Sequence, residues 1–458
     1  MKTAGIQAEI NVKTLTLDQV FNLNLQNYPD KVDEIVVEAS NEARHEKEIS
    51  EIEQKWKVAN FDIVPYKKGT EERGYALKAT DDIKVQLEDH LITLQQIAGS
   101  RYVAAFKTRV GNWEKWLNLI TEIIDLWLVV QKKWMYLEGI FIGADDIRQQ
   151  LPDEAKRFDK TDRNFIKMMD ATYRNPNIYA CCILADTKLQ DLRNLSGDLD
   201  KCQKSLSEYL DSKRNIFPRF YFISDDELLS ILGSSDPEMI QVHLLKLFDN
   251  CKKLDFKGKQ ITGMHSDEGE RYAFKEPRKA EGAVENWMNK VDDEMKSTLK
   301  RITKEAVYYY HKDERTQWVR AQLGMVCLVG TQIWWTWRVE DVFNKVKEGN
   351  KYAMKQESEK QTKDLNDLIT LIRSDITSLE RKKINTLIIL DVHARDIVDR
   401  FVRDSILDKK EFEWESQLRF YWNNELDDIV VEQTQGRFKY SYEYQGLNGR
   451  LVITPLTD

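Results

Sequence analysis

Residues 111–158 read GNWEKWLNLITEIIDLWLVVQKKWMYLEGIFIGADDIRQQLPDEAKRF, and this stretch decides the fold. Its apolar residues recur at alternating spacings of three and four: Trp113, Trp116, Ile120, Ile123, Trp127, Val130, Trp134, Leu137 and Phe141. That spacing places all of them on one side of a single helix. Four tryptophans on one helix face need a broad, closely packed partner surface. The stretch therefore predicts a large helical core, with the tryptophans between helices rather than around a ligand.

The composition of the whole chain agrees with a helical protein that has more than one core. At 458 residues the chain is too long for a single compact core, so several subdomains are expected. Only 8 prolines and 19 glycines occur, which favours long helices. The net charge of -8 argues against nucleic acid as a partner, because such a partner favours a basic face. We expect no membrane partner either, since no apolar run reaches membrane-spanning length and the first residues are too polar for a signal peptide.

Changes in periodicity divide the chain into six predicted segments. In order they are an N-terminal helical segment (1–58), a hairpin with the tryptophan-rich helices (59–175), a middle helical subdomain (176–253), a hairpin or irregular insertion (254–282), a C-terminal helical bundle (283–424) and β-strands (425–458). The strands are expected because apolar and polar residues alternate there between glycines. The predicted fold class is mainly α, with small β-hairpins and C-terminal strands.

Short sequence signals predict individual boundaries. Ser224 and Glu227 have the spacing of a capping box, which starts a helix. Asn175 and Pro176 end one helix, and another is expected from 178 to 214. The bundle should contain three further helices, over 317–346, 352–379 and 384–404.

The search for reactive groups finds no assembled site. A phosphate-binding loop reads GxxxxGK[ST], because backbone amides surround the phosphates and the Lys reaches them. Gly258 and Gly263 have the glycine spacing, but Met264 and His265 follow instead of Lys and a hydroxyl residue. We interpret Asp391 and its neighbours as a charged helix face. The histidines, which lack metal-ligand spacing, are His45, His90, His243, His265, His311 and His393.

The cysteines indicate a reduced, cytosolic chain. The five residues, none of them in a CxxC pair, are Cys181, Cys182, Cys202, Cys251 and Cys327. Without a pairing or metal motif they are interpreted as small buried apolar side chains. We therefore predict no catalytic residue, no metal and no cofactor within this chain.

Four blocks of sequence, in this order, resemble the linker region of dynein heavy chains. They are WMYLEGIF at 134–141 with DI at 146–147 and QLP at 150–152, YLDSKR at 209–214 with FPRFYF at 217–222 and DELL at 226–229, QIWWT at 332–336 with VE at 339–340, and residues 438–458, ending RLVITPLTD. Their order and separations across nearly the whole chain make the resemblance specific. ILGSSDP at 231–237 and HLLKLFDN at 243–250 resemble an axonemal, inner-arm type.

The resemblance implies an elongated, arched stack of helical bundles that acts as a mechanical lever. In such motors the linker swings across the AAA+ ring of the same heavy chain and produces the ATP-driven power stroke along microtubules. The lever is not catalytic, and ATP and Mg serve the parent motor. Further partners of the parent protein would be dynein light and intermediate chains and microtubules, in the cytoplasm and cytoskeleton and in the axoneme of a cilium or flagellum.

The resemblance also gives the C-terminal end a role. The first AAA+ module is expected just after this chain, and Val452, Ile453 and Thr454 would then run past the edge of the adenine in the complete motor. Without that module, we expect the sheet over 428–454 to be exposed, because its faces and edges need a neighbour. A lever also bends where few contacts cross it, and the two candidates, between which the sequence does not decide, are the Asn175-Pro176 break and the 254–282 segment. A static helical scaffold or adaptor that binds other proteins through its helix faces is the alternative function.

Overall fold

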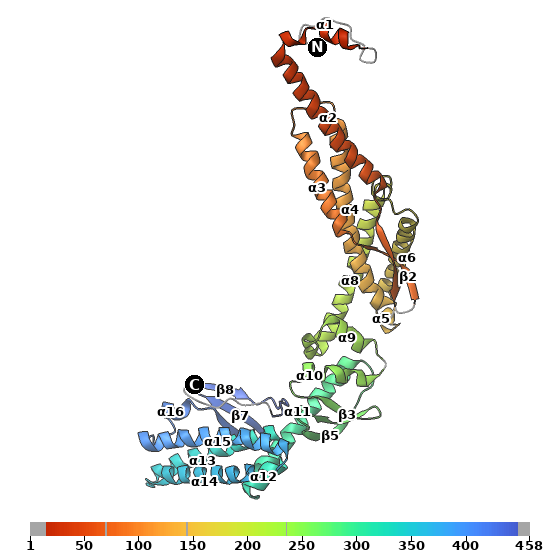
Figure 1. The fold of residues 1–458 in the computed structure, drawn as a ribbon. Coiled ribbons are helices and arrows are strands. Elements are labelled where there is room, and N and C mark those ends of the chain that lie inside the picture. The colour runs from red at the N-terminus through yellow and green to blue at the C-terminus, as the bar shows by residue number, and fades with distance from the viewer. Residues whose placement is uncertain (1–14, 69–70, 143–144, 235, 448–458) are drawn as a thin grey trace. The chain divides into compact units, whose positions relative to one another are not determined.

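The structure is a computed structural model that describes residues 15–68, 71–142, 145–234 and 236–447 (Figure 1). Helices account for 67% of the chain, and the described residues also form three small antiparallel sheets. The predicted fold class, mainly α with small hairpins, is confirmed. The chain divides into two compact units, residues 1–207 and 208–458. The finer division into six segments stays a prediction.

The first unit consists of helices and one hairpin. Its elements are α1 (Leu17–Asn22), η2 (Leu25–Asn27), α2 (Pro29–Val58), β1 (Asp62–Lys68), β2 (Glu71–Lys78), α3 (Asp81–Ala98), α4 (Lys107–Phe141), α5 (Asp145–Gln150), α6 (Pro152–Arg174), α7 (Ile178–Cys182) and the first part of α8 (Lys188–Ile216). Helix α4 is the 35-residue helix that the tryptophan spacing predicts, and α3 runs alongside it (Figure 1).

The core of the first unit lies around α4. Trp127 and Trp134 are fully buried, whereas Trp116 is half-buried. The ring of Phe61, just before β1, lies 5.6 Å from the ring of Trp127, and the ring of Phe165 on α6 lies 4.6 Å from that of Trp134. The tryptophans therefore join the hairpin and α6 to one helix, as the sequence predicts.

The break at Asn175 and Pro176 is tied to the end of α2. The Phe61 N–H donates to the Pro176 carbonyl at 2.8 Å, and the Ile178 N–H donates to the Ala59 carbonyl at 2.9 Å. The prediction that few contacts cross this break is therefore wrong. The helix expected from 178 to 214 is also interrupted, because α7 ends at Cys182 and α8 begins at Lys188. The side chain of Lys188 points into the protein at this interruption.

The second unit combines two sheets with a helical bundle. Its elements after α8 are η3 (Pro218–Phe222), α9 (Asp225–Leu232), η4 (Pro237–His243), α10 (Leu244–Leu247), β3 (Lys253–Lys257), β4 (Gln260–His265), β5 (Arg271–Lys279), α11 (Val284–Tyr309), α12 (Arg315–Ala321), α13 (Gly324–Lys347), α14 (Ala353–Ile372), α15 (Ser378–Asp404), α16 (Phe412–Glu415), β6 (Arg419–Asn423), β7 (Asp428–Gln433) and β8 (Gly436–Lys439). The strand orders are β3-β4-β5 and β6-β7-β8, all antiparallel. Ser224 caps α9 in the predicted capping box.

The segment 254–282 is an ordered sheet rather than an irregular insertion. A buried carboxylate of α11 holds it, because Glu294 accepts from the Glu276 N–H at 3.0 Å and from the Arg278 guanidinium at 2.6 Å. The expectation of few contacts across this segment is therefore also wrong. The hairpin that the sequence suggests is present as β3–β4, and β5 adds a third strand.

Two of the predicted helices are wrong in length. The helix expected over 317–346 is interrupted, because Gln322 has an extended backbone and its carbonyl accepts from the Lys383 ammonium. The helix expected over 352–379 ends at Ile372. A second capping box, formed by Thr377 and Glu380, starts α15 earlier than predicted.

Candidate functional site

The residues that follow β8 lead toward the predicted nucleotide-edge residues. Val452, Ile453 and Thr454 themselves lie outside the described residues. Residues 440–447, here called the terminal segment, form no helix or strand in the structure. Their side chains nevertheless include three that are almost fully buried: Tyr442, Tyr444 and Leu447.

Glu270 is the central partner of the terminal segment. It lies in the turn between β4 and β5 and is 4% exposed. Its Oε2 accepts from the Tyr444 hydroxyl at 3.0 Å, and its Oε1 accepts from the Gly324 N–H, at the start of α13, at 2.7 Å. Burial and the Glu270 carboxylate raise the pKa of Tyr444, so the phenol stays a neutral donor. One carboxylate therefore joins a turn, a helix start and the terminal segment.

Two glycines allow the backbone and side chains to approach at this point. A Cβ on Gly324 would lie 2.0 Å from a methyl group of Leu447. Gly446 has a φ of +57, and a Cβ there would lie 2.1 Å from the amide nitrogen of Asn250. That amide donates to the Gln445 carbonyl at 3.2 Å. The left-handed φ favours glycine at position 446, and at both positions a Cβ would force a neighbouring side chain, Asn250 or Leu447, to move.

Arg219 in η3 provides a second attachment. Its guanidinium lies 2.6 Å from Glu443 of the terminal segment and 2.8 Å from Asp292 on α11, and it donates to the Leu247 carbonyl at 3.2 Å. Burial opposes the charge, but hydrogen bonds and attraction from both carboxylates raise the pKa of Arg219. A half-buried arginine shared by two carboxylates holds three parts of the chain in one arrangement.

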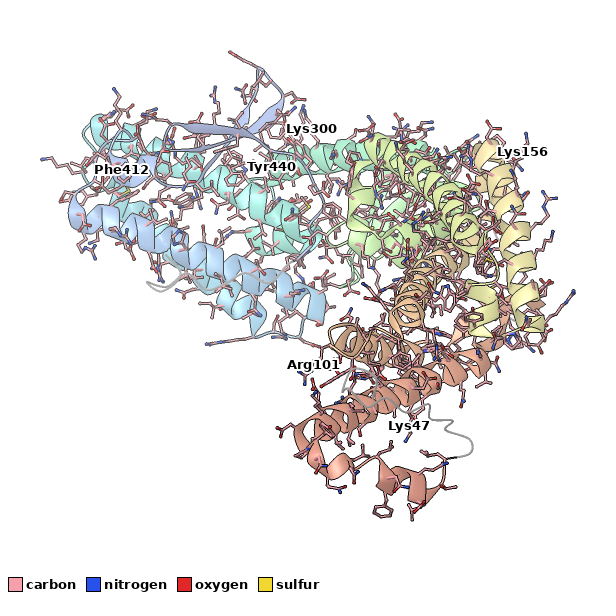
Figure 2. All side chains as sticks on the ribbon, turned by 90° about the horizontal axis from the view of Figure 1, so that it is seen from above. Lys47, Arg101, Lys156, Lys300, Phe412 and Tyr440 are labelled. Carbon is pink, nitrogen blue, oxygen red and sulfur yellow. The ribbon has the colours of Figure 1, made fainter. Side chains whose placement is uncertain are left out.

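Asp428, at the start of β7, holds the first half of the terminal segment. Its Oδ1 accepts from the Tyr442 hydroxyl at 2.8 Å, and its Oδ2 lies 3.6 Å from the Lys300 ammonium on α11. Burial opposes ionisation, but the bonds from Tyr442 and the Ile429 N–H and the charge of Lys300 lower the pKa of Asp428. Lys300, on α11, is labelled in Figure 2.

The prediction of an exposed C-terminal sheet is wrong for β7, which is buried, whereas β8 is exposed, with Phe438 59% accessible. Ile429 is fully buried and Val430 nearly so. The Phe420 N–H donates to the Thr336 hydroxyl at 3.1 Å, and the Tyr421 hydroxyl donates to Glu340 at 2.7 Å. Helix α13 therefore covers strand β6 of this sheet, whose cover was expected from a neighbouring module.

Buried ion pairs connect the helices of the same bundle. Arg315 lies 2.6 Å from Asp391, which joins α12 to α15, and Arg338 lies 3.1 Å from Asp364, which joins α13 to α14. Burial raises the pKa of Asp391, although Arg315 opposes this. The interpretation of Asp391 as part of a charged helix face is therefore wrong, because the carboxylate is an internal partner. The sequence alone does not indicate which carboxylate a buried arginine will pair with.

The glycines and cysteines that the sequence analysis considered occupy structural positions. Gly258 lies in the turn between β3 and β4, and Gly263 lies inside β4, so they form no phosphate-binding loop before a helix. Within the described residues, no three His, Cys, Asp or Glu side chains are grouped so that they could hold a metal ion. Burial raises the pKa of Cys182, Cys251 and Cys327 to about 12. These cysteines remain protonated and act as small core residues, as interpreted from the sequence.

Sequence reasoning missed the partners of the terminal segment. The tyrosines at 440, 442 and 444 indicate burial, but their alternation was read as a strand. Tyr442 has a φ of +56, which ends strand geometry and lets Tyr444 reach Glu270. Glu270 stands in no motif, and Arg219 lies in the FPRFYF block at 217–222, but nothing in that block indicates that its partner is Glu443.

Fold and contacts together define the class of this chain: a mainly helical structural element with an anchored terminal segment. The sequence model of the family "Dynein heavy chain, N-terminal region 2" matches residues 1–306. The chain is 51% identical over 452 residues to "Dynein axonemal heavy chain 10" of Homo sapiens, which covers 97% of this chain and 10% of that protein. It is 53% identical over 460 residues to "Dynein-1-alpha heavy chain, flagellar inner arm I1 complex" of Chlamydomonas reinhardtii, and this match covers 100% of the present chain and 10% of that protein.

The chain belongs to the dynein heavy chain family, and the resemblance stated from its sequence is confirmed. It spans about a tenth of the length of these relatives. A third relative, "Dynein axonemal heavy chain 2" of Homo sapiens, is 38% identical over 460 residues. Among the described helices, none combines the length and the apolar character needed to cross a bilayer.

Proposed function

We propose that this chain is the mechanical linker of an axonemal dynein heavy chain. The linker swings across the AAA+ ring of the same heavy chain and produces the ATP-driven power stroke along microtubules. It is not itself catalytic, and ATP and Mg belong to the parent motor, as do the light and intermediate chains and the microtubule. Its location is the cytoskeleton of the axoneme, in a cilium or flagellum.

The anchored terminal segment is the observation that supports a lever most directly. A lever transmits force only if its attached end does not yield. Glu270, Arg219 and Asp428 each bond the terminal segment to a different part of the second unit. Buried or half-buried polar groups with several partners, of this kind, favour a single arrangement. The segment that precedes Val452, Ile453 and Thr454 is therefore firmly held.

The first unit has the internal packing that stiffness requires. Helix α4 is 35 residues long, or about 50 Å at the rise of an α-helix. Its tryptophans are enclosed by the hairpin and α6, and closely packed interiors resist compression. A static scaffold could have the same internal packing. The lever and the scaffold must therefore be distinguished by measuring whether the chain moves.

Nucleotide-dependent distance measurement tests the proposal. In a complete heavy chain motor, a donor fluorophore is inserted next to Met1 of this chain and an acceptor is placed on the ring. A lever predicts that the transfer efficiency differs between the nucleotide-free motor and the motor with ADP and vanadate. A control with both fluorophores on the ring should change less. Equal efficiency in all nucleotide states would support the static scaffold instead.

A further inference from the structure

A groove of about 840 Å³ lies between α6 and the first part of α8, within the first unit. Contacts close both of its ends. At one end the Ser205 hydroxyl donates to Glu154 at 3.1 Å, and at the other the Lys188 ammonium donates to the Thr172 hydroxyl at 3.3 Å. The two helices are thus antiparallel, and they separate between these contacts.

Polar side chains line the walls of the groove. On α6, Lys160, Asn164 and Lys167 face it, at spacings of four and three that place them on one side of the helix. On α8, Asp191, Asn194, Asp198 and Lys201 have the same spacings and line the opposite wall. Two helices that pack only on each other would present apolar faces, so these faces are suited to a polar occupant.

The charge of the lining is positive in an otherwise acidic chain. The five cations are Lys160, Lys167, Lys188, Arg193 and Lys201, and the two carboxylates are Asp191 and Asp198. Arg193 is already paired with Glu122, which is not part of the lining, at 2.6 Å. Five cations against Asp191, Asp198 and Glu122 leave a surplus of two positive charges, whereas the whole chain has a net charge of -8.

Both carboxylates are already engaged inside the groove. Asp198 lies 3.7 Å from Lys201, and Asp191 accepts from the Thr187 hydroxyl at 3.0 Å. Within the described residues, Lys160 and Lys167 have no ion-pair partner. The two lysines of α6 are therefore available to a ligand.

Lys188 places a further positive charge at the buried end of the groove. The residue is 8% exposed, and its ammonium lies 3.9 Å from the centre of the Trp127 ring. Within the described residues it forms no ion pair with a carboxylate. Burial lowers the pKa of Lys188, because a charge removed from water without a counter-ion is costly. A ligand carboxylate at this end would supply the missing counter-ion.

We propose that the groove binds an extended acidic segment of a partner protein. The charge surplus is matched by a run of Asp or Glu residues. The wall from Lys160 to Ala171 extends about 16 Å at 1.5 Å per helical residue. At about 3.3 Å per extended residue, this length suits a segment of about five residues. The inference does not depend on the lever function, because it concerns only the first unit.

Fluorescence anisotropy with a labelled oligoglutamate peptide of about six residues tests the proposal on the 458-residue chain. We expect binding that weakens as salt rises. The double variant Lys160→Glu/Lys167→Glu should bind at least about tenfold more weakly. The matched control Lys31→Glu/Lys47→Glu makes the same change of charge at exposed sites of α2 (Lys47 is labelled in Figure 2). Its affinity for the peptide should stay much closer to that of the parent. Equal affinity in the parent and both double variants would overturn the proposal.

A second variant separates binding from folding. Lys188→Met keeps an apolar stem on Trp127 and removes the buried charge. It should bind the peptide more weakly than the parent while its thermal unfolding temperature is no lower. Unchanged affinity would remove Lys188 from the site. If an oligothymidylate of equal charge binds the parent as tightly as the peptide does, the groove does not select acidic peptides and the proposal fails.

Discussion

Trp127 and Trp134 are the single side chains on which the first unit depends most. Both are fully buried on α4, and truncation to alanine would leave a large unfilled volume. We expect Trp127→Ala and Trp134→Ala each to lower the free energy of unfolding by about 3–5 kcal/mol, measured by urea unfolding. The control Val129→Ala, on an exposed side of the same helix, should cost far less. If either tryptophan variant unfolds as the parent does, the tryptophan core is not structural.

Asp428 gives the second unit a defined response to acid. Its folded pKa is lowered, so its stabilising contribution is complete above the unfolded value of about 3.9 and is lost as the pH falls through the folded value. The difference in free energy of unfolding between the parent and Asp428→Asn should be constant above about pH 5 and should shrink below about pH 4. A difference that does not change with pH would contradict the bonding assigned to this carboxylate.

Ile453 tests the role proposed for the residues beyond the terminal segment. If Val452, Ile453 and Thr454 run past the adenine edge, a charge there would face an apolar ring. We expect Ile453→Asp in the complete heavy chain to weaken ATP binding, measured with a fluorescent nucleotide. The control variant Asp458→Asn shows how a change of charge a few residues away affects ATP binding. Unchanged affinity in Ile453→Asp would leave these residues only a connecting role.

Among the elements, α15 depends on a cap that is visible in sequence. Thr377 and Glu380 bond each other's backbone N–H groups at the start of this helix, which satisfies donors that have no partner within the helix. Thr377→Ala should lower the free energy of unfolding by about 1 kcal/mol. Ser378→Ala, at the adjacent exposed position, should change it by less than about 0.5 kcal/mol. Equal effects of the two variants in urea unfolding would contradict the capping assignment.

The elements show which parts of the fold are readable from sequence. The spacing of the tryptophans and the Ser224 capping pattern are local, and both predict the elements that the structure contains. The interruption at Gln322 depends on Lys383 and Leu447, which are distant in sequence. The position of the terminal segment likewise depends on Glu270 and Arg219. Local periodicity cannot report partners of this kind, because long-range pairing leaves no regular pattern.

For the whole molecule, the proposed lever requires that force pass through the terminal segment. The second unit satisfies this requirement by its own contacts, since the β6–β8 sheet packs on α13 and the terminal segment is bonded to Glu270 and Arg219. Up to Leu447, the last described residue, the chain is therefore attached to the second unit by specific contacts. Loss of that attachment should separate ATP turnover from movement.

The most direct measurement compares gliding velocity with ATP turnover in a complete heavy chain motor that carries Glu270→Ala. Hydrogen exchange first establishes that residues 440–447 are released in the variant. The account predicts that microtubules then glide more slowly while ATP turnover is largely retained, and that Glu281→Ala, an exposed control, changes neither. A variant with a released terminal segment and an unchanged gliding velocity would contradict it.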